Sequence, residues 1–358
     1  MQYPCKYPST YTGGPWVVKT RNDYANIAAA AARVKAGASE KPCIMCLGDS
    51  IVAGRTVTND TCFPGIIRDW LGSAFGDVGK GGRGSLYLYE GEFYHYTGTW
   101  TRVWGECVGF ASCAYSTSSS GAAVAFEFAG EGVDLYFGGG LMDCDASMSF
   151  EIDGDEAGTL NLASVADGAK TYTHSINGLV PGPHMAQITR TSGTLIFVGW
   201  APAKGVSGIV VHNCGVPSST TAMWAQETAL CTIDMLAPKL TIIESAFNDW
   251  RLGITRTAYQ ANLTAIANRA LQHGDVLMLA AGLHGQYTPQ ETPDGTIFDF
   301  RDAMEDVAVN LGVGFVDGLT RWREDYDWAY NNGLVTDAVH PSAAGQYDYA
   351  RMLAQEIF

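Results

Sequence analysis

The pattern of apolar and polar positions changes twice along the chain, and its first part predicts a strand between two helices. The first helix runs from Asn22, a capping residue type, to Gly37. An apolar strand follows at residues 43–47. The stretch "FPGIIRDWLGSAFG" predicts the second helix, with Pro64 near its start. Together these elements place a strand, a turn and a helix around Ser50.

The helical period disappears between about residues 87 and 204, where short alternating segments are separated by glycine-rich turns. This pattern predicts an antiparallel β-sandwich. The expected strands are residues 123–128, 133–137, 148–153, 171–176, 184–189 and 194–201.

Apolar strands and amphipathic helices alternate again after residue 204, which predicts a mostly parallel sheet covered on both faces. The expected strands are residues 205–213, 239–247, 275–281 and 313–317, and the expected helices are 220–236, 257–272, 300–311 and 342–358. We therefore expect one α/β domain made of residues 1–86 and 205–358, with a β-sandwich inserted at 87–204. Because no long Pro/Ser linker flanks the insertion, we expect the two to share a fixed interface.

Composition and charge narrow the range of partners. The chain has 358 residues, of which 47% are apolar and 16% charged, as in ordinary globular proteins. Its net charge of -15 repels phosphate backbones and anionic lipid surfaces, so nucleic acid and membrane are not expected partners. No apolar run reaches membrane-spanning length, and the first ten residues lack the features of a secretion signal.

The cysteines and acidic turns do not point to a metal or redox centre. Nine cysteines, an odd number, are scattered through the chain, which argues against a disulfide scaffold. Cys43 and Cys46 sit on a predicted buried strand, where residues three apart point to opposite faces, so we interpret them as buried thiols. The stretches "MDCDAS" and "DGDEAG" are better explained as hairpin turns than as calcium ligands. We expect no metal and no organic cofactor.

Ser50 lies just past the end of the first strand, where open parallel sheets bind ligands. A serine hydroxyl needs a base within hydrogen-bond reach and a third group that holds the base. His340, with Asp337 three residues before it, lies in the loop ahead of the last predicted helix. The alternative is that Asp49 and Ser50 only cap a helix, that Asp337 forms a turn, and that His340 is a surface residue.

A third candidate, Asn248, follows the buried strand "TIIESAF". A carboxamide there can donate a hydrogen bond to a developing oxyanion. The alternative is an asparagine that caps a helix or forms a turn, the commoner use of that residue after a strand.

Taken together, these stretches resemble the SGNH (GDSL-like) esterases and acetylhydrolases over about residues 41–83 and 205–358. "GDSIVAG" resembles their first block, "VHNCGVPSSTTAMW" the second, "AFND" the third and "DAVHPS" the last. The resemblance implies a flavodoxin-like three-layer fold and a catalytic triad of Ser50, Asp337 and His340. It also implies an oxyanion hole made by the N–H groups of Ser50 and Ser218 and the carboxamide of Asn248.

The chain departs from the family pattern at two positions. Gly215 takes the place of the first glycine in the second block, but Ser218 stands where the family usually has the second. A backbone N–H does not require glycine, so Ser218 can donate if its dihedrals are tolerated. Phe247 stands where a glycine often precedes Asn-Asp, and Gly215, Phe247 and Trp250 are candidate substrate contacts.

The resemblance implies a serine esterase that forms an acyl-serine intermediate, and we expect O-acetyl groups on a carbohydrate or polysaccharide as its substrate. The layout is also similar to esterases of phage tails and bacterial surface systems, which would place the protein on a virion or outside the cell. Two alternatives stay open: a lipase or thioesterase for longer acyl chains, and a non-catalytic glycan-binding adhesin or virion protein. The aromatic residues between 86 and 104 are interpreted either as a sugar platform or, more simply, as core or domain interface.

Overall fold

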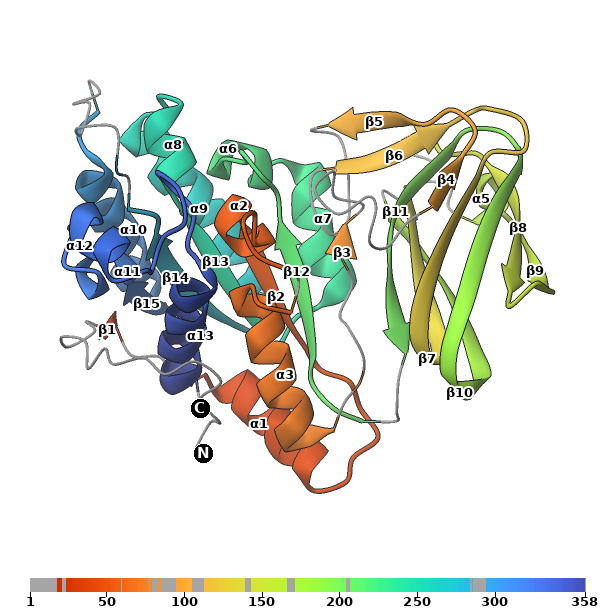
Figure 1. The fold of residues 1–358 in the computed structure, drawn as a ribbon, viewed down its shortest axis with the longest axis horizontal. Coiled ribbons are helices and arrows are strands. Elements are labelled where there is room, and N and C mark those ends of the chain that lie inside the picture. Colours follow the sequence, from red (N-terminus) through yellow and green to blue (C-terminus); the bar gives the residue numbers. More distant parts are fainter. Residues whose placement is uncertain are drawn as a thin grey trace.

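A parallel β-sheet between two layers of helices forms the larger part of the molecule (Figure 1). The computed structural model describes residues 18–20, 24–58, 60–76, 78, 83–84, 95–104, 113–138, 143–165, 171–203, 207–283, 285 and 294–357. The strands of this sheet are β2 (Cys43–Gly48), β12 (Val210–Gly215), β13 (Leu240–Ala246), β14 (Asp275–Ala281) and β15 (Gly314–Asp317), with β1 (Val18–Thr20) antiparallel to β15 at the edge.

The order of the parallel strands is β12-β2-β13-β14-β15. Numbered by their appearance along the chain, this is the order 2-1-3-4-5 of flavodoxin-like sheets. The order reverses between β2 and β13, so the residues that follow these two strands lie at the switch point where such folds bind ligands. The α/β fold that the sequence predicts is confirmed.

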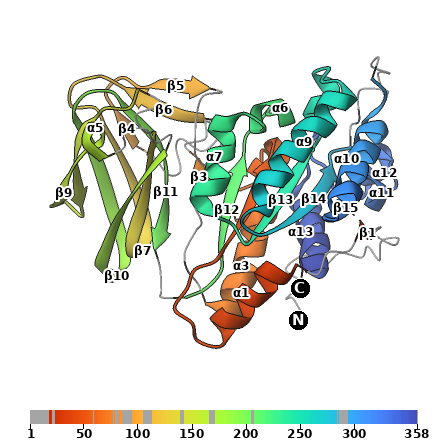
Figure 2. The same cartoon turned by 180° about the vertical axis from the view of Figure 1, so that it is seen from behind.

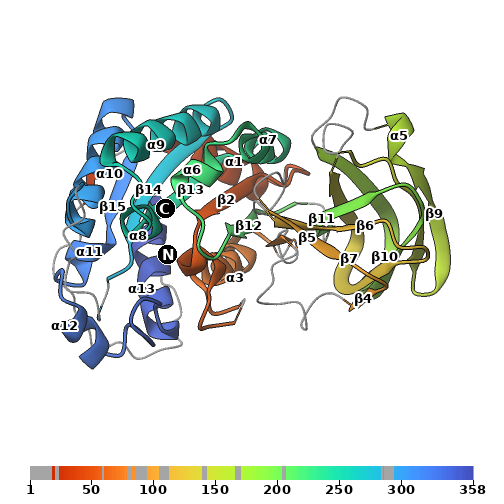
Figure 3. The ribbon, with the colours of Figure 1, turned by 90° about the horizontal axis from the view of Figure 1, so that it is seen from above.

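Helices cover both faces of this sheet, as the view from above shows (Figure 3). Helices α3 and α13 pack on each other on one face, and α1 packs against α3; α7, α9 and α10 line the other face, which is seen from behind in Figure 2. The main helices are α1 (Ala25–Lys35), α3 (Phe63–Phe75), α7 (Glu227–Leu236), α9 (Arg256–Leu271), α10 (Ile297–Leu311) and α13 (Ala343–Ile357). Short helices are α2 (Ser50–Ala53), α6 (Thr221–Trp224), α8 (Phe247–Arg251), α11 (Gly318–Arg321) and α12 (Tyr326–Asn331).

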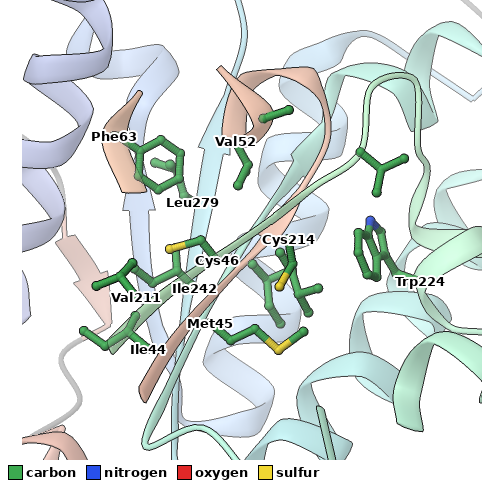
Figure 4. Close-up of a cluster of buried hydrophobic side chains, with 14 of the residues drawn as sticks. Ile44, Met45, Cys46, Val52, Phe63, Val211, Cys214, Trp224, Ile242 and Leu279 are labelled. Carbon is green, nitrogen blue, oxygen red and sulfur yellow. The ribbon is translucent and has the colours of Figure 1, made fainter. Parts of the chain in front are cut away.

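The central strands are buried along their whole length, which explains their continuous apolar runs. Figure 4 shows β2 side chains meeting those of β12, α3 and α6 in one cluster. Burying one aliphatic side chain of this size contributes about 1.5–3 kcal/mol, so the cluster fixes the strand ends that carry the polar residues. Cys43 and Cys46 are buried here, as expected, and burial raises the pKa of the Cys43 thiol to about 12.

Residues 95–203 form an antiparallel β region with its own aromatic core, beside the α/β part (Figure 1). The rings of Phe126 and Trp200 stack with centroids 4.8 Å apart, and Phe137 packs on Phe150 and Phe197. Its elements are β4 (His95–Thr97), β5 (Thr101–Trp104), β6 (Cys113–Thr117), β7 (Ala123–Gly138), β8 (Ser147–Ile152), β9 (Asp155–Asn161), α5 (Leu162–Val165), β10 (Thr171–Ser192) and β11 (Leu195–Ala203).

Several element boundaries differ from those expected. The two predicted strands at 123–128 and 133–137 are one strand, β7, and those at 171–176 and 184–189 are one strand, β10. In β10 the register shifts between Asn177 and Gly182, so the glycine-rich stretch forms an irregularity within a strand instead of a turn. The predicted helix at 220–236 is two helices, α6 and α7, separated at Ala225 and Gln226.

The two parts of the molecule are joined through β3 (Arg83–Gly84), which pairs with β12 on one side and β11 on the other. The expected domain limits at 86 and 204 fall outside the described residues and stay a prediction, and the capping role of Asn22 also lies outside them. The described helix α1 begins at Ala25. None of the described helices is long and apolar enough to cross a bilayer.

Candidate active site

Ser50 is the first residue of α2, immediately after β2. Asp49 caps this short helix, since its Oδ1 accepts a hydrogen bond from the Ile51 N–H over 2.8 Å. Gly54, with φ 74°, ends the helix after one turn. Capping by Asp49 and a nucleophile role for Ser50 are therefore not alternatives here: Asp49 caps the helix, and the Ser50 Oγ is left to interact with another side chain.

The Ser50 Oγ lies 3.0 Å from the Nε2 of His340, 290 positions later in the chain. The Nδ1 of the same ring lies 2.8 Å from Oδ2 and 3.1 Å from Oδ1 of Asp337. A neutral imidazole that donates from Nδ1 to the carboxylate keeps the Nε2 lone pair for the serine hydroxyl. The structure thus brings together the three side chains that the sequence singled out, in the order that nucleophilic catalysis requires.

The Asp337 carboxylate is held by the loop that carries it. Burial raises the pKa of Asp337, but the backbone N–H groups of His340 and Val339 and the His340 ring all donate to the carboxylate, and the net effect lowers its pKa. The charged form is therefore favoured, which suits a group that orients and stabilises an imidazolium.

Contacts from several elements fix this loop relative to Ser50. The Oγ1 of Thr56, just after α2, donates to the Pro341 carbonyl over 2.9 Å. The Tyr326 hydroxyl donates to the Asp337 carbonyl, and the Gly285 N–H donates to the Ala338 carbonyl. The separation of His340 from Ser50 is therefore set by packing and not by the sequence distance between them.

Asn248 lies in α8, directly after β13, with its carboxamide buried beside the nucleophile turn. Its Nδ2 donates to the Asp49 Oδ2 over 2.9 Å and to the Ser219 carbonyl over 3.1 Å. The residue therefore bridges the turn after β2 and the loop after β12. Both Nδ2 hydrogens are engaged, so an oxyanion at Ser50 would have to share or replace one of these acceptors.

The loop after β12 carries Ser218 in the left-handed region, with φ 66°. A glycine adopts this conformation without the steric penalty of a Cβ, which explains why glycine suits this position. Ser219, the next residue, donates from Oγ to the Gly48 carbonyl over 3.1 Å and ties the loop to the end of β2. Ala246, at the end of β13, has φ 128°, so both polypeptide segments that flank Ser50 contain a strained residue.

Three buried carboxyl groups surround the nucleophile turn: Asp49, Glu244 on β13 and Asp249 on α8. Burial is the main cause that raises their pKa values, to about 6 for Asp49 and Asp249 and well above the ordinary value for Glu244. Asp249 also accepts hydrogen bonds from the N–H and Oγ1 of Thr221, which anchors α6. Glu244 and Asp249 are not among the candidates drawn from the sequence, although acidic residues at the end of an apolar strand are a usable signal.

Three candidate substrate contacts are buried. Phe247 and Trp250 have exposed fractions of 2% and 3%, and their rings pack on each other with centroids 6.0 Å apart. A Cβ on Gly215 would lie 2.1 Å from the Ala53 backbone nitrogen, so this glycine lets β12 pack against α2. Their role as substrate contacts stays a prediction, and the glycine at position 215 has a packing explanation.

No group of three or more His, Cys, Asp or Glu side chains suited to a metal occurs within the described part of the chain. In "DGDEAG", Asp153 and Gly154 have positive φ in the hairpin between β8 and β9, which is the turn geometry expected. Among the aromatic residues at 86–104, positions 86–94 lie outside the described residues. Tyr96 packs on the rings of Trp100 and Tyr115, both at 5.0 Å.

The chain is similar to known proteins in part of its sequence and in its fold. Residues 192–347 match the model of the GDSL-like Lipase/Acylhydrolase family. A structure described as "Peptidoglycan O-acetylesterase in action, 5 min" is similar with a TM-score of 0.72 and 16% sequence identity, over 96% of this chain and 98% of that chain. The comparison with curated proteins gives no match.

Two further solved structures are similar over a smaller part. One is a family two carbohydrate esterase from Clostridium thermocellum in complex with cellohexaose, with a TM-score of 0.32, 12% identity, 68% of this chain and 94% of that chain. The other is a catalytic mutant of Axe2, an acetylxylan esterase from Geobacillus stearothermophilus, with a TM-score of 0.36, 20% identity, 42% of this chain and 74% of that chain. The family-model match shows that residues 192–347 are similar to the GDSL-like Lipase/Acylhydrolase family, and the first structural likeness shows a shared fold.

Proposed function

We propose that the protein is a serine esterase that removes O-acetyl groups from a carbohydrate through an acyl-serine intermediate. The observation that carries this proposal is the 3.0 Å separation of the Ser50 Oγ and the His340 Nε2, with Asp337 bound to the other ring nitrogen. The family-model match over residues 192–347 supports hydrolase chemistry at the coarser level.

Ser50, His340 and Asp337 take part in both half-reactions, which are acylation of the serine and hydrolysis of the acyl-serine. The His340 Nε2 takes the Ser50 proton while the Oγ attacks the acyl carbon, and the imidazolium then gives this proton to the leaving sugar oxygen as the ester bond breaks. A water molecule next loses a proton to the same nitrogen and attacks the acyl-serine. Acetate leaves, and the proton returns to Ser50.

The negative charge that develops on the acyl oxygen must be stabilised by hydrogen-bond donors. The Ser50 N–H is at the start of α2 and the Ser218 N–H is in the loop after β12, and neither has an acceptor among the described residues. They are the first two donors of the proposed oxyanion hole. Asn248 is the third, sharing an Nδ2 hydrogen that it now donates to Asp49 or to the Ser219 carbonyl.

Esters with acyl chains of different length test the proposed specificity for acetyl groups. We expect faster hydrolysis of 4-nitrophenyl acetate than of 4-nitrophenyl octanoate, and a preference for octanoate would favour a lipase or thioesterase. The natural substrate is then sought by mass spectrometry of acetate released from acetylated xylan, acetylated peptidoglycan and other acetylated glycans. Peptidoglycan is included because of the fold shared with a peptidoglycan O-acetylesterase, which at 16% identity shows the fold alone.

A non-catalytic role as an adhesin is the second candidate, and two observations favour it. Ser218 adopts a backbone conformation that suits glycine, and both Nδ2 hydrogens of Asn248 already have acceptors. If the oxyanion hole cannot form, the fold would bind a glycan without cleaving it. Binding of an acetylated polysaccharide with no release of acetate would support this candidate.

A further inference from the structure

Glu244 is a buried acid that the proposed reaction does not use. It lies on β13, next to the strand that leads to Ser50, and 1% of its surface is exposed. Its Oε2 accepts a hydrogen bond from the Asp49 N–H over 3.2 Å, and its Oε1 has no donor among the described residues. A buried carboxylate oxygen without a donor costs up to several kcal/mol of free energy. A proton on the carboxyl group, or a hydrogen-bond donor, removes this cost.

The Glu244 carboxyl lies against Asp49, because its Oε2 is 3.2 Å from the Asp49 nitrogen, and the charges of the two carboxyl groups repel each other. Two carboxylates this close cannot both ionise, so the pair retains a proton near neutral pH. Asp49 receives hydrogen bonds from the Ile51 N–H and the Asn248 Nδ2, whereas Glu244 receives one, from the Asp49 N–H. Because the Asp49 carboxylate receives more hydrogen bonds, its charged form is the better stabilised of the two, and the shared proton is placed on Glu244.

We propose that the Glu244 carboxyl stays protonated, donates a hydrogen bond to the Asp49 carboxylate, and thereby fixes the Asn248 carboxamide beside Ser50. Glu244 is then a positioning residue, which acts on the oxyanion donor through Asp49. This inference rests on the proposed function, because the donor that Glu244 positions serves the ester hydrolysis.

The surroundings of Glu244 favour the protonated form. The ionisable groups that act on it from the packed elements are Asp49 after β2, Asp249 on α8, Tyr259 on α9 and Tyr349 on α13. None of these groups is a cation, and burial is the first cause that raises the Glu244 pKa, followed by repulsion from Asp49. The hydrogen bond between the two side chains acts in opposite directions, raising the pKa of Glu244 and lowering that of Asp49.

The side chain at position 244 must be able to donate a hydrogen bond to Asp49. A glutamine can donate from its Nε2 to Asp49 without a titratable proton, whereas an alanine cannot donate and leaves a cavity. We expect E244A to lower kcat by about 10- to 100-fold with little change in KM, as a displaced catalytic donor does. We expect E244Q to recover most of the lost turnover.

A double-mutant cycle with Asn248 separates positioning from a general structural role. If Glu244 acts through Asn248, E244A should lower turnover in the wild type and have little further effect in N248A. An equal loss in both backgrounds would overturn the proposal. T241V serves as the matched control, because Thr241 is a buried polar residue on the same strand whose Oγ1 has no partner among the described residues; its turnover should stay near that of the wild type.

An infrared measurement tests the proton directly and needs no substrate. At neutral pH the wild type and T241V should show the C=O stretching band of a protonated carboxylic acid, which E244Q should lack. Absence of this band from the wild-type minus E244Q difference spectrum would overturn the proposal even if the protein is an active esterase. A wild type that releases no acetate and is not labelled at Ser50 would instead refute the proposed function and remove the role of Glu244 with it.

Discussion

The Nε2 of Gln346, on the last helix, donates to the Ile51 carbonyl oxygen in the nucleophile turn over 2.9 Å. Its Oε1 accepts a hydrogen bond from the Phe63 N–H at the start of α3, also over 2.9 Å. One buried carboxamide thus links the helix that follows His340 to both elements that follow β2. The short distance between Ser50 and His340 depends on this link between segments nearly 300 residues apart.

Replacing Gln346 by methionine keeps the length of the side chain and removes both hydrogen bonds. Because the buried Phe63 N–H would lose its acceptor, while the Ile51 carbonyl would keep only the Gly54 N–H, we expect Q346M to lower the free energy of unfolding by about 1–3 kcal/mol. We also expect a lower kcat, measured with an acetate ester. Q260M is the control: Gln260 donates to the Ala303 carbonyl on the opposite helical layer, so its loss should leave kcat near the wild-type value.

Asn248→Ala removes the proposed third oxyanion donor. The charge that it stabilises exists mainly in the transition state, so we expect kcat to fall by about 100-fold or more while KM changes little. Steady-state kinetics with 4-nitrophenyl acetate measure both constants. N262A is a matched control, because Asn262 bonds the Thr221 Oγ1 and not Asp49. An effect of N248A confined to KM would contradict the oxyanion role.

Ser218→Gly removes an exposed Cβ from a residue in the left-handed region. The relief of strain exceeds the greater chain entropy of glycine, so we expect the free energy of unfolding to rise by up to about 1 kcal/mol. Turnover should be kept, since the N–H remains in place. S218A retains the Cβ and should match the wild type in a denaturant titration; equal stabilities of S218G and S218A would show that the strain is absent.

Asp249→Asn tests the buried carboxyl groups through the pH dependence of stability. Burial raises the pKa of Asp249 to about 6, above its value of about 3.9 in the unfolded chain. The folded state therefore binds more protons between these values, and this contribution to stability, complete below about pH 4, is lost as the pH rises through about 6. We expect the Tm of D249N minus that of the wild type to be larger at pH 7 than at pH 4.5. A difference that does not vary with pH would contradict the raised pKa.

Much of the site could be predicted from local patterns, because Ser50 and Asn248 each follow a strand that the apolar pattern marks clearly. Asp337 and His340 are three residues apart, so their contact is nearly local. The bridge from Asn248 to Asp49 could not be predicted, since it depends on the register of β13 against β2.

The elements that the sequence placed wrongly share a physical cause. Glycine marks irregular positions within strands as well as turns, so the pattern predicts a turn around Gly182 although β10 continues through it. The break between α6 and α7 has no proline or glycine to mark it. The surroundings of Glu244 could not be predicted from a local pattern, because the Asp49 N–H that donates to it lies 195 positions earlier in the chain.

The central claim is that the Ser50 hydroxyl is an activated nucleophile, and covalent labelling tests it most directly. The wild-type protein should react with a fluorophosphonate probe, and mass spectrometry should place the adduct on Ser50. H340A should react much more slowly, and S50A should not react at all. A folded wild-type protein that takes up no probe, or an S50A variant labelled as fast as the wild type, would contradict the account.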